Sequence, residues 1–214
     1  MKIIVSPDSF KGSCSAMQAA KTIEEAIRSL NDMVELVTIP VADGGEGTVD
    51  VIAGCTVSTI HEVMVCGPMG EPIPARYVML DDSKMAVIEM AQASGLTLVA
   101  ESNRNPMVAT SYGTGQLIRD ALDSGCKKLI IGIGGSATND GGVGALMALG
   151  ASFKDAKGDE ISLGAAAVAE IAFIDLENLD QRLFETELIV ACDVTNPLTG
   201  EHGASRVYLM GIRQ

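Results

Sequence analysis

Three short loops rich in glycine and polar residues hold the side chains most able to do chemistry. The first loop places a carboxylate, a hydroxyl and an ammonium close together, at Asp8, Ser9 and Lys11. Such a group could recognise a polar anionic substrate. The alternative is that Lys11 is a solvated surface lysine, and the residues alone leave both interpretations open.

The second loop surrounds two carboxylates with glycine. Gly44 and Gly45 separate Asp43 from Glu46, and glycines let a ligand approach the backbone closely. Asp43 and Glu46 could hold Mg²⁺ directly or through water, or Asp43 could act as a general base on a substrate hydroxyl. Asp140, further along the chain, is a second candidate metal ligand. The alternative is a glycine-rich turn with incidental carboxylates.

The third loop has the composition of a phosphate-binding loop. Its glycines can present backbone N–H groups, its hydroxyls can donate to phosphate oxygens, and the helix expected after it adds a partial positive charge. It lacks both the Gly-Lys-Ser/Thr ending of a Walker A loop and the spacing of a dinucleotide fingerprint. A purely structural turn between strand and helix is the alternative. The candidate residues are Gly134, Gly135, Ser136, Thr138, Asn139 and Asp140.

Two further polar stretches are weaker candidates. Asp193 and Asn196 follow an apolar run, so they would lie at another strand end. Ser111 and Thr114 precede a helical pattern and are interpreted as N-caps rather than as ligands.

Hydrophobic periodicity indicates how these loops are positioned. Short apolar runs typical of strands precede the loops, and a capping box at Ser15 and Gln18 starts a helix with one apolar face. Because ligands gather beyond the carboxyl ends of parallel strands, the loops are expected at one edge of a sheet. The expected strands cover residues 3–5, 34–39, 73–80, 85–90, 129–133 and 188–192; further helices are expected from residue 48 and over residues 114–124 and 139–149.

Composition argues against several classes of protein. A formal net charge of −13 does not suit a nucleic-acid or anionic-membrane surface, although it leaves room for an anionic substrate. The isolated His61 and His202 argue against zinc and Ser-His-Asp chemistry. Five cysteines without a CxxC pair indicate free thiols, and neither a signal peptide nor a membrane helix is recognisable. A cytoplasmic protein is expected.

Taken in order along the chain, the loops resemble the motifs of bacterial-type glycerate kinases, the type-1 family. The stretches PDSFKGS at 7–13, ADGGEGT at 42–48 and GGSATNDGG at 134–142 carry the resemblance. It extends from Met1 to about Val207, and further matches are CGPMG at 66–70, IEMAQASGL at 88–96, NP at 105–106, TSYGTG at 110–115 and ACDVTNPLTG at 191–200.

The resemblance implies an ATP- and Mg²⁺-dependent kinase that phosphorylates D-glycerate at its 2-hydroxyl, giving 2-phosphoglycerate in organic-acid catabolism. It also implies an α/β fold of two domains with the active site in the cleft between them. Residues 1–66 would form the N-terminal part of a Rossmann-like domain whose parallel sheet is incomplete in this chain, and residues 67–214 a second α/β domain. A kinase for another small hydroxy acid is the alternative.

The resemblance also implies roles for individual residues. Lys11 would contact an anionic oxygen of glycerate or ATP, and Asp43 would serve Mg²⁺ or the substrate hydroxyl. Residues 134–140 would contact phosphate, while Asp193 and Asn196 would close the cleft. Phosphoryl transfer depends mainly on positioning and charge neutralisation, which loops of Asp, Lys, Ser and Gly suit.

The resemblance stops after residue 207, and the chain is a little over half as long as a typical family member. A truncated or frameshifted gene product is therefore expected. Strands without neighbours would expose pairing edges, so the chain would be inactive alone, would need a complementing C-terminal fragment, or would form a homo-oligomer.

Overall fold

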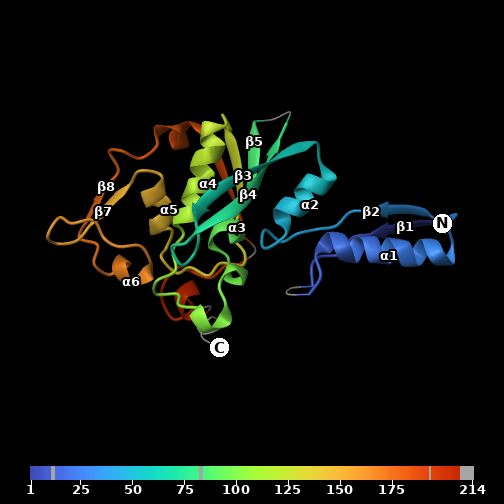
Figure 1. The fold of residues 1–214 in the computed structure, drawn as a ribbon, viewed down its shortest axis with the longest axis horizontal. Helices are drawn as coiled ribbons and strands as arrows, with labels where there is room; N and C mark the ends of the chain where they lie inside the picture. The colour runs from blue at the N-terminus through green and yellow to red at the C-terminus, as the bar shows by residue number, and fades with distance from the viewer. Residues whose placement is uncertain (11–12, 82–83, 193, 208–214) are drawn as a thin grey trace.

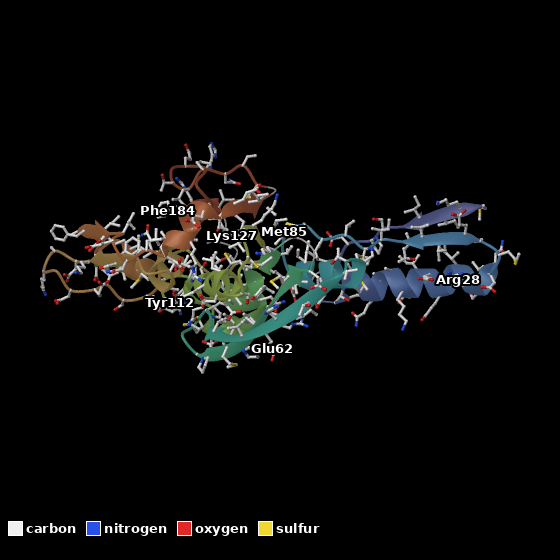
Figure 2. The ribbon with its side chains drawn as sticks, turned by 90° about the horizontal axis from the view of Figure 1, so that it is seen from above. Arg28, Glu62, Met85, Tyr112, Lys127 and Phe184 are labelled. Atoms are coloured by element: carbon white, nitrogen blue, oxygen red, sulfur yellow. The ribbon has the colours of Figure 1, made fainter. Side chains whose placement is uncertain are left out.

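The computed structural model describes residues 1–10, 13–81, 84–192 and 194–207, which form an elongated α/β molecule. At one end β1 (Lys2–Val5), α1 (Ala16–Leu30) and β2 (Glu35–Thr38) make up what we call the N-terminal lobe. Figures 1 and 2 both show this lobe extending away from the rest of the described chain, which we call the body.

In the N-terminal lobe, β1 and β2 pair in parallel from Lys2 opposite Glu35 to Val5 opposite Thr38. The predicted capping box begins α1: the Gln18 amide donates to Ser15 Oγ at 3.2 Å, and the Ser15 amide donates to Gln18 Oε1 at 3.0 Å. The predicted apolar face of α1 is buried only near its start, and Leu30 near its end is 88% exposed. Two four-residue strands are too narrow to cover a helix of 15 residues.

The body is organised around a five-stranded mixed sheet with the order β3-β4-β5-β6-β9 among the described residues. The first three strands are antiparallel neighbours, and β5, β6 and β9 are parallel. The strands are β3 (Ser58–Cys66), β4 (Pro72–Leu80), β5 (Met85–Glu89), β6 (Lys128–Gly132) and β9 (Glu187–Ala191).

Helices lie on both faces of this sheet over β3, β4 and β5 (Figure 1), whereas the side chains of β9 are mostly exposed. On one face α2 (Thr48–Cys55) packs Val49 against Val78 and Val87. On the other face α4 (Tyr112–Asp123) buries Leu117 against a core that includes Tyr77 and Ile88. Neighbouring strand residues such as Tyr77 and Val78 serve opposite faces because side chains alternate along a strand. The short helices α3 (Ala91–Ser94) and α5 (Val143–Ala148) pack on α4.

The remaining elements are short. β7 (Ser152–Lys154) and β8 (Phe173–Asp175) form an antiparallel pair, and Phe153 anchors a small separate core. The other short elements are α6 (Ala165–Val168), η1 (Leu96–Leu98), η2 (Glu101–Asn103) and η3 (Gln181–Glu185). All five cysteines are free thiols, and none of the described helices is long and apolar enough to cross a membrane.

The structure confirms the six predicted strands to within a residue or two and adds β3, β7 and β8, which the sequence pattern did not reveal. Since β3 pairs with β4, the predicted boundary between residues 66 and 67 falls between two paired strands. How the chain divides into domains stays a prediction. The helix predicted over residues 139–149 begins only at Val143, because Gly141 and Gly142 have φ values of +63° and +82°, outside the helical range.

Candidate functional site

A cavity of about 500 Å³ lies where the N-terminal lobe meets the body. The lobe contributes the loop after β1 and the first turn of α1, and the loop after β2 and α2 form the facing wall. Arg76 of β4 and Gln92 of α3 complete the lining. The lining residues are Asp8, Ser9, Phe10, Ser13, Cys14, Ser15, Ala16, Met17, Val41, Ala42, Glu46, Gly47, Asp50, Val51, Arg76 and Gln92.

The cavity contains part of the predicted substrate site. Asp8 is exposed and Ser9 is half-buried, and the Ser9 amide donates to Asp8 Oδ1. Lys11, predicted beside them, lies outside the described residues. On the opposite wall Arg76 Nη2 is 3.2 Å from Asp50 Oδ1, so an ion pair of a guanidinium and a carboxylate borders the cavity.

The second predicted loop connects this cavity to the sheet. Asp43 is exposed, and its Oδ1 accepts a hydrogen bond from the Gly45 amide at 2.9 Å. The turn continues as Thr48 Oγ1 donates to the Gly45 carbonyl at 2.8 Å. Gly44 has a φ of +86°, a conformation that favours glycine. The loop thus holds Asp43 at the surface and brings Glu46 to the cavity.

The second and third predicted loops meet backbone to backbone. The Gly134 amide donates to the Gly44 carbonyl at 3.3 Å. A Cβ on Gly132 would lie 2.3 Å from the Gly44 carbonyl oxygen, and a Cβ on Gly134 would lie 2.8 Å from Gly45 Cα. Side chains at these positions would separate the loops, so these glycines have a packing role, as the structural alternative for the third loop predicted.

Within the third loop the hydroxyls bind each other. Ser136 Oγ and Thr138 Oγ1 are 2.8 Å apart, and the Thr138 amide donates to Ser136 Oγ at 2.9 Å. Gly135 has a φ of +72°, and its carbonyl accepts from the Leu96 amide at 2.8 Å. Asn139 Oδ1 accepts from Ser205 Oγ at 2.7 Å. None of these third-loop residues lines the cavity formed by the described residues.

Asp140 is fully occupied by hydrogen bonds inside the protein. Its carboxylate is 2% exposed and accepts from the Ser111 amide at 2.8 Å and the Ser111 hydroxyl at 2.9 Å. The amides of Gly142 and Gly144 also donate to it. The anion at the start of α5 is therefore the protein's own carboxylate, and this geometry gives no support to a metal at Asp140. Ser111 occupies the N-cap position of α4 as predicted, but its hydroxyl serves Asp140.

The structure describes only one of the two residues predicted to close the cleft, Asp193 and Asn196. Asn196 Nδ2 donates to the His202 carbonyl at 3.0 Å, within the loop that follows β9, whereas Asp193 lies outside the described residues. Among the residues that the structure describes, no three or more His, Cys, Asp or Glu side chains gather as a metal site.

Sequence reasoning did not single out Glu89, the last residue of β5. Its side chain is fully buried, and it accepts from the Gly47 amide at 3.2 Å and the Val49 amide at 3.1 Å. Burial raises the pKa of this carboxyl above its ordinary value, because loss of hydration outweighs the hydrogen bonds from Val49, Gly47 and Gln92. The sequence did contain one signal for this residue: a carboxylate directly follows the apolar run of β5.

Comparison with known proteins gives consistent matches. The family model described as "Glycerate kinase family" matches residues 3–210. The glycerate kinase of Bacillus subtilis (strain 168) is 52% identical and the glycerate 2-kinase of Escherichia coli (strain K12) 50% identical, each over 208 residues. These matches cover 97% of this chain but 54% and 55% of the relatives, so the chain spans about half their length.

A solved structure agrees with the sequence relatives. The crystal structure of a Salmonella typhimurium LT2 protein that carries the name glycerate kinase 2 superposes with a TM-score of 0.86 at 48% identity. The match covers 99% of this chain and 57% of that one. With the family model matching nearly the whole chain, this protein belongs to the glycerate kinase family.

Proposed function

We propose that this chain carries the substrate-binding part of a kinase that transfers a phosphoryl group from ATP to D-glycerate at its 2-hydroxyl, giving 2-phosphoglycerate. The observation that carries the proposal is the cavity at the lobe–body junction, where Asp8 and Ser9 face the loop that contains Glu46. These loops are far apart in sequence, and the sequence predicts chemical roles for both.

The cavity walls suit a small hydroxy acid. Carboxylates at Asp8 and Glu46 can accept hydrogen bonds from substrate hydroxyls, and Ser9 can donate one. Asp43 is the candidate base for the 2-hydroxyl, and Lys11 the candidate cation for an anionic oxygen. Phosphoryl transfer requires this kind of positioning and charge neutralisation more than covalent chemistry by the protein.

The carboxylates of Asp43 and Glu46, two exposed residues, also suit Mg²⁺, which prefers carboxylate ligands and would neutralise charge on the ATP phosphates. Gly134, Gly135, Ser136 and Thr138 remain the candidates for phosphate contact, because the packing of their loop on Gly44 and Gly45 places it beside the loop of Asp43 and Glu46. Asn139 likewise stays a candidate for phosphate contact. Asn196 and Asp193 are the candidate residues that close the cleft, in a protein expected to work in the cytoplasm.

Glycerate-dependent ADP release by the purified chain tests the proposal directly. The chain is incubated with Mg·ATP and D-glycerate, and ³¹P NMR identifies which phosphoglycerate forms. We expect 2-phosphoglycerate, loss of at least tenfold in rate in D43N, and an unchanged rate in D32N, a matched change at an exposed aspartate of the lobe. A folded chain that releases no ADP would contradict activity of this polypeptide alone.

Two further comparisons decide between the remaining alternatives. Faster turnover with glycolate or L-glycerate than with D-glycerate would favour a kinase for another hydroxy acid. The remaining length of a relative, added as a separate polypeptide, tests complementation; size-exclusion chromatography tests a homo-oligomer. Activity that appears only in the presence of the added polypeptide would show that this chain needs a complementing partner.

A further inference from the structure

Glu89 is a buried carboxylate to which the proposed reaction assigns no role. It ends β5 opposite Gly132 of β6, and its side chain has no exposed surface. A carboxylate withdrawn from water is costly unless it is hydrogen-bonded. Both carboxylate oxygens are hydrogen-bonded: Oε1 accepts from the Gly47 amide and Oε2 from the Val49 amide.

These two amides belong to the start of α2, where a helix leaves N–H groups without intrahelical partners. The N-cap residue is Gly47, which has a φ of +94° and offers no side chain to accept them. Glu89 therefore caps α2 from a different strand. A cap from a distant element fixes the start of the helix relative to the sheet, which a local cap cannot do.

The same point of the sheet contacts the neighbouring loops. The Met90 amide donates to the Gly132 carbonyl at 2.9 Å, and Gly132 lies against Gly44. Gln92, which lines the cavity, lies close enough to Glu89 to lower its pKa. Glu89 thus connects the end of β5, the loop after β2 and the cavity wall.

The loop that Glu89 holds has little rigidity of its own. Gly44 and Gly47 both have positive φ, and glycine has more backbone conformations to lose than any other residue. Asp43 and Glu46 lie between the β2 end and the capped amides. An external anchor is therefore needed to hold these two carboxylates in one place.

We propose that Glu89 is a positioning residue for the kinase reaction: its carboxylate fixes the loop from Asp43 to Gly47 against the sheet and so holds Glu46 at the cavity and Asp43 at the adjoining surface. This inference rests on the proposed function. Glu89 is fully buried and does not line the cavity, so it acts through the loop.

E89Q is the principal test, with E62Q as its matched control. A glutamine has one acceptor oxygen and an NH₂ group, which would face one of the two amide donors. Glu62 lies on β3 of the same sheet with its side chain exposed, where Figure 2 labels it. In E89Q we expect hydrogen exchange of the Gly47 and Val49 amides to accelerate about tenfold to a hundredfold. We expect E62Q to match the wild type.

Kinetics distinguish positioning from a purely structural role. In E89Q we expect kcat to fall about tenfold or more while the KM for ATP changes less than threefold. Partial recovery is expected in E89D, which keeps the charge. If exchange and kcat both stay within twofold of the wild type in E89Q, the inference is wrong. A wild-type chain that makes no ADP would count against the proposed function, and the exchange data would still decide the role of Glu89.

One measurement needs no variant and covers the case in which E89Q does not fold. In the wild-type chain the NMR shifts of the Gly47 and Val49 amides should titrate together with the Glu89 carboxyl carbon. Asp50 of α2 also raises the pKa of Glu89, so the Asp50 carboxyl carbon must be followed in the same titration. Its ion-pair partner Arg76 is the other charged group nearby, and a guanidinium keeps its charge throughout. Amides that do not follow Glu89 would overturn the proposal.

Discussion

The N-terminal lobe and the body both place polar loops after parallel strands, but they bury very different amounts of their own surface. In the lobe Ile4 is 64% exposed, Leu30 88% and Met33 91%. In the body the sheet lies between α2 and α4, and side chains such as Leu117 and Leu129 are completely buried. A two-stranded sheet is marginal in water, whereas a sheet covered on both faces has its own core.

Because of this difference, one wall of the cavity is supported by much less buried core than the other. Asp8 and Ser9 lie on the lobe, which has little core, and the loop holding Asp43 and Glu46 is attached to the body through Glu89 and the glycine contacts. Local opening free energies follow buried contacts, so we expect the two walls to open independently, the lobe more often.

The largest expected effect is the difference in stability loss when a leucine is truncated in the body and in the lobe. L117A removes a fully buried side chain of the body and should cost about 2–5 kcal/mol of unfolding free energy. L30A is the matched change in the lobe and should cost under about 0.5 kcal/mol, because that side chain is already in water. Urea unfolding of both variants measures this. A cost for L30A similar to that of L117A would show that the lobe is as well packed as the body.

The second prediction uses the buried carboxyl of the body. The folded state raises the pKa of Glu89, so it binds this proton more tightly than the unfolded chain does. Stability should therefore fall as pH rises from the ordinary glutamate pKa to the raised one, by at most about 1.4 kcal/mol per pH unit for one proton. Melting curves against pH should show this slope in the wild type and a flatter one in E89Q. The same pH dependence of stability in the wild type and in E89Q would contradict this prediction.

A smaller effect is expected at the helix start in the lobe. S15A removes the hydroxyl of the capping box and should cost about 1 kcal/mol. Because the lobe shares little core with the body, hydrogen exchange should accelerate in α1 and stay unchanged in β5 and β6. S29A, near the end of the same helix, serves as the control. Equal acceleration in both regions would mean that they unfold as one unit.

The smallest effect concerns the ion pair across β1 and β2. Lys2 Nζ is 3.1 Å from Glu35 Oε1, and both side chains are more than half exposed. Exposed pairs contribute under about 1 kcal/mol and weaken with salt. A double-mutant cycle with K2A and E35A at low and high salt checks this. A coupling above that range would mean that charge compensates for the missing core of the lobe.

Local signals predicted most of the elements that carry the site. Apolar runs located the strands before the loops, and Ser15 with Gln18 located the start of α1, because these patterns depend on neighbours in sequence. The rule for parallel strand ends predicted that the loops after β1 and β2 lie at one edge, and residues of both loops line the cavity. The family resemblance then indicated a chemistry that the loops alone left open.

What the sequence did not reveal depends on partners far along the chain. The cap on α2 comes from Glu89, and the hydrogen bonds of Asp140 come partly from Ser111, so no local pattern contains either interaction. α5 starts at Val143, later than predicted, because Gly141 and Gly142 adopt positive φ. Composition alone does not show that these two glycines have positive φ. The exposure of Leu30 depends on how many strands lie beside α1.

The cap that α2 receives from β5 also affects the order in which the chain can fold during synthesis. Val49 and Glu89 are 40 residues apart. At common rates of translation, about 2–8 s pass between the addition of one and the other. A helix of eight residues is not stable alone over that interval. The nascent α2 segment therefore stays without its cap until β5 has left the ribosome. A chaperone that binds this segment during that interval would bind it in an unfolded state.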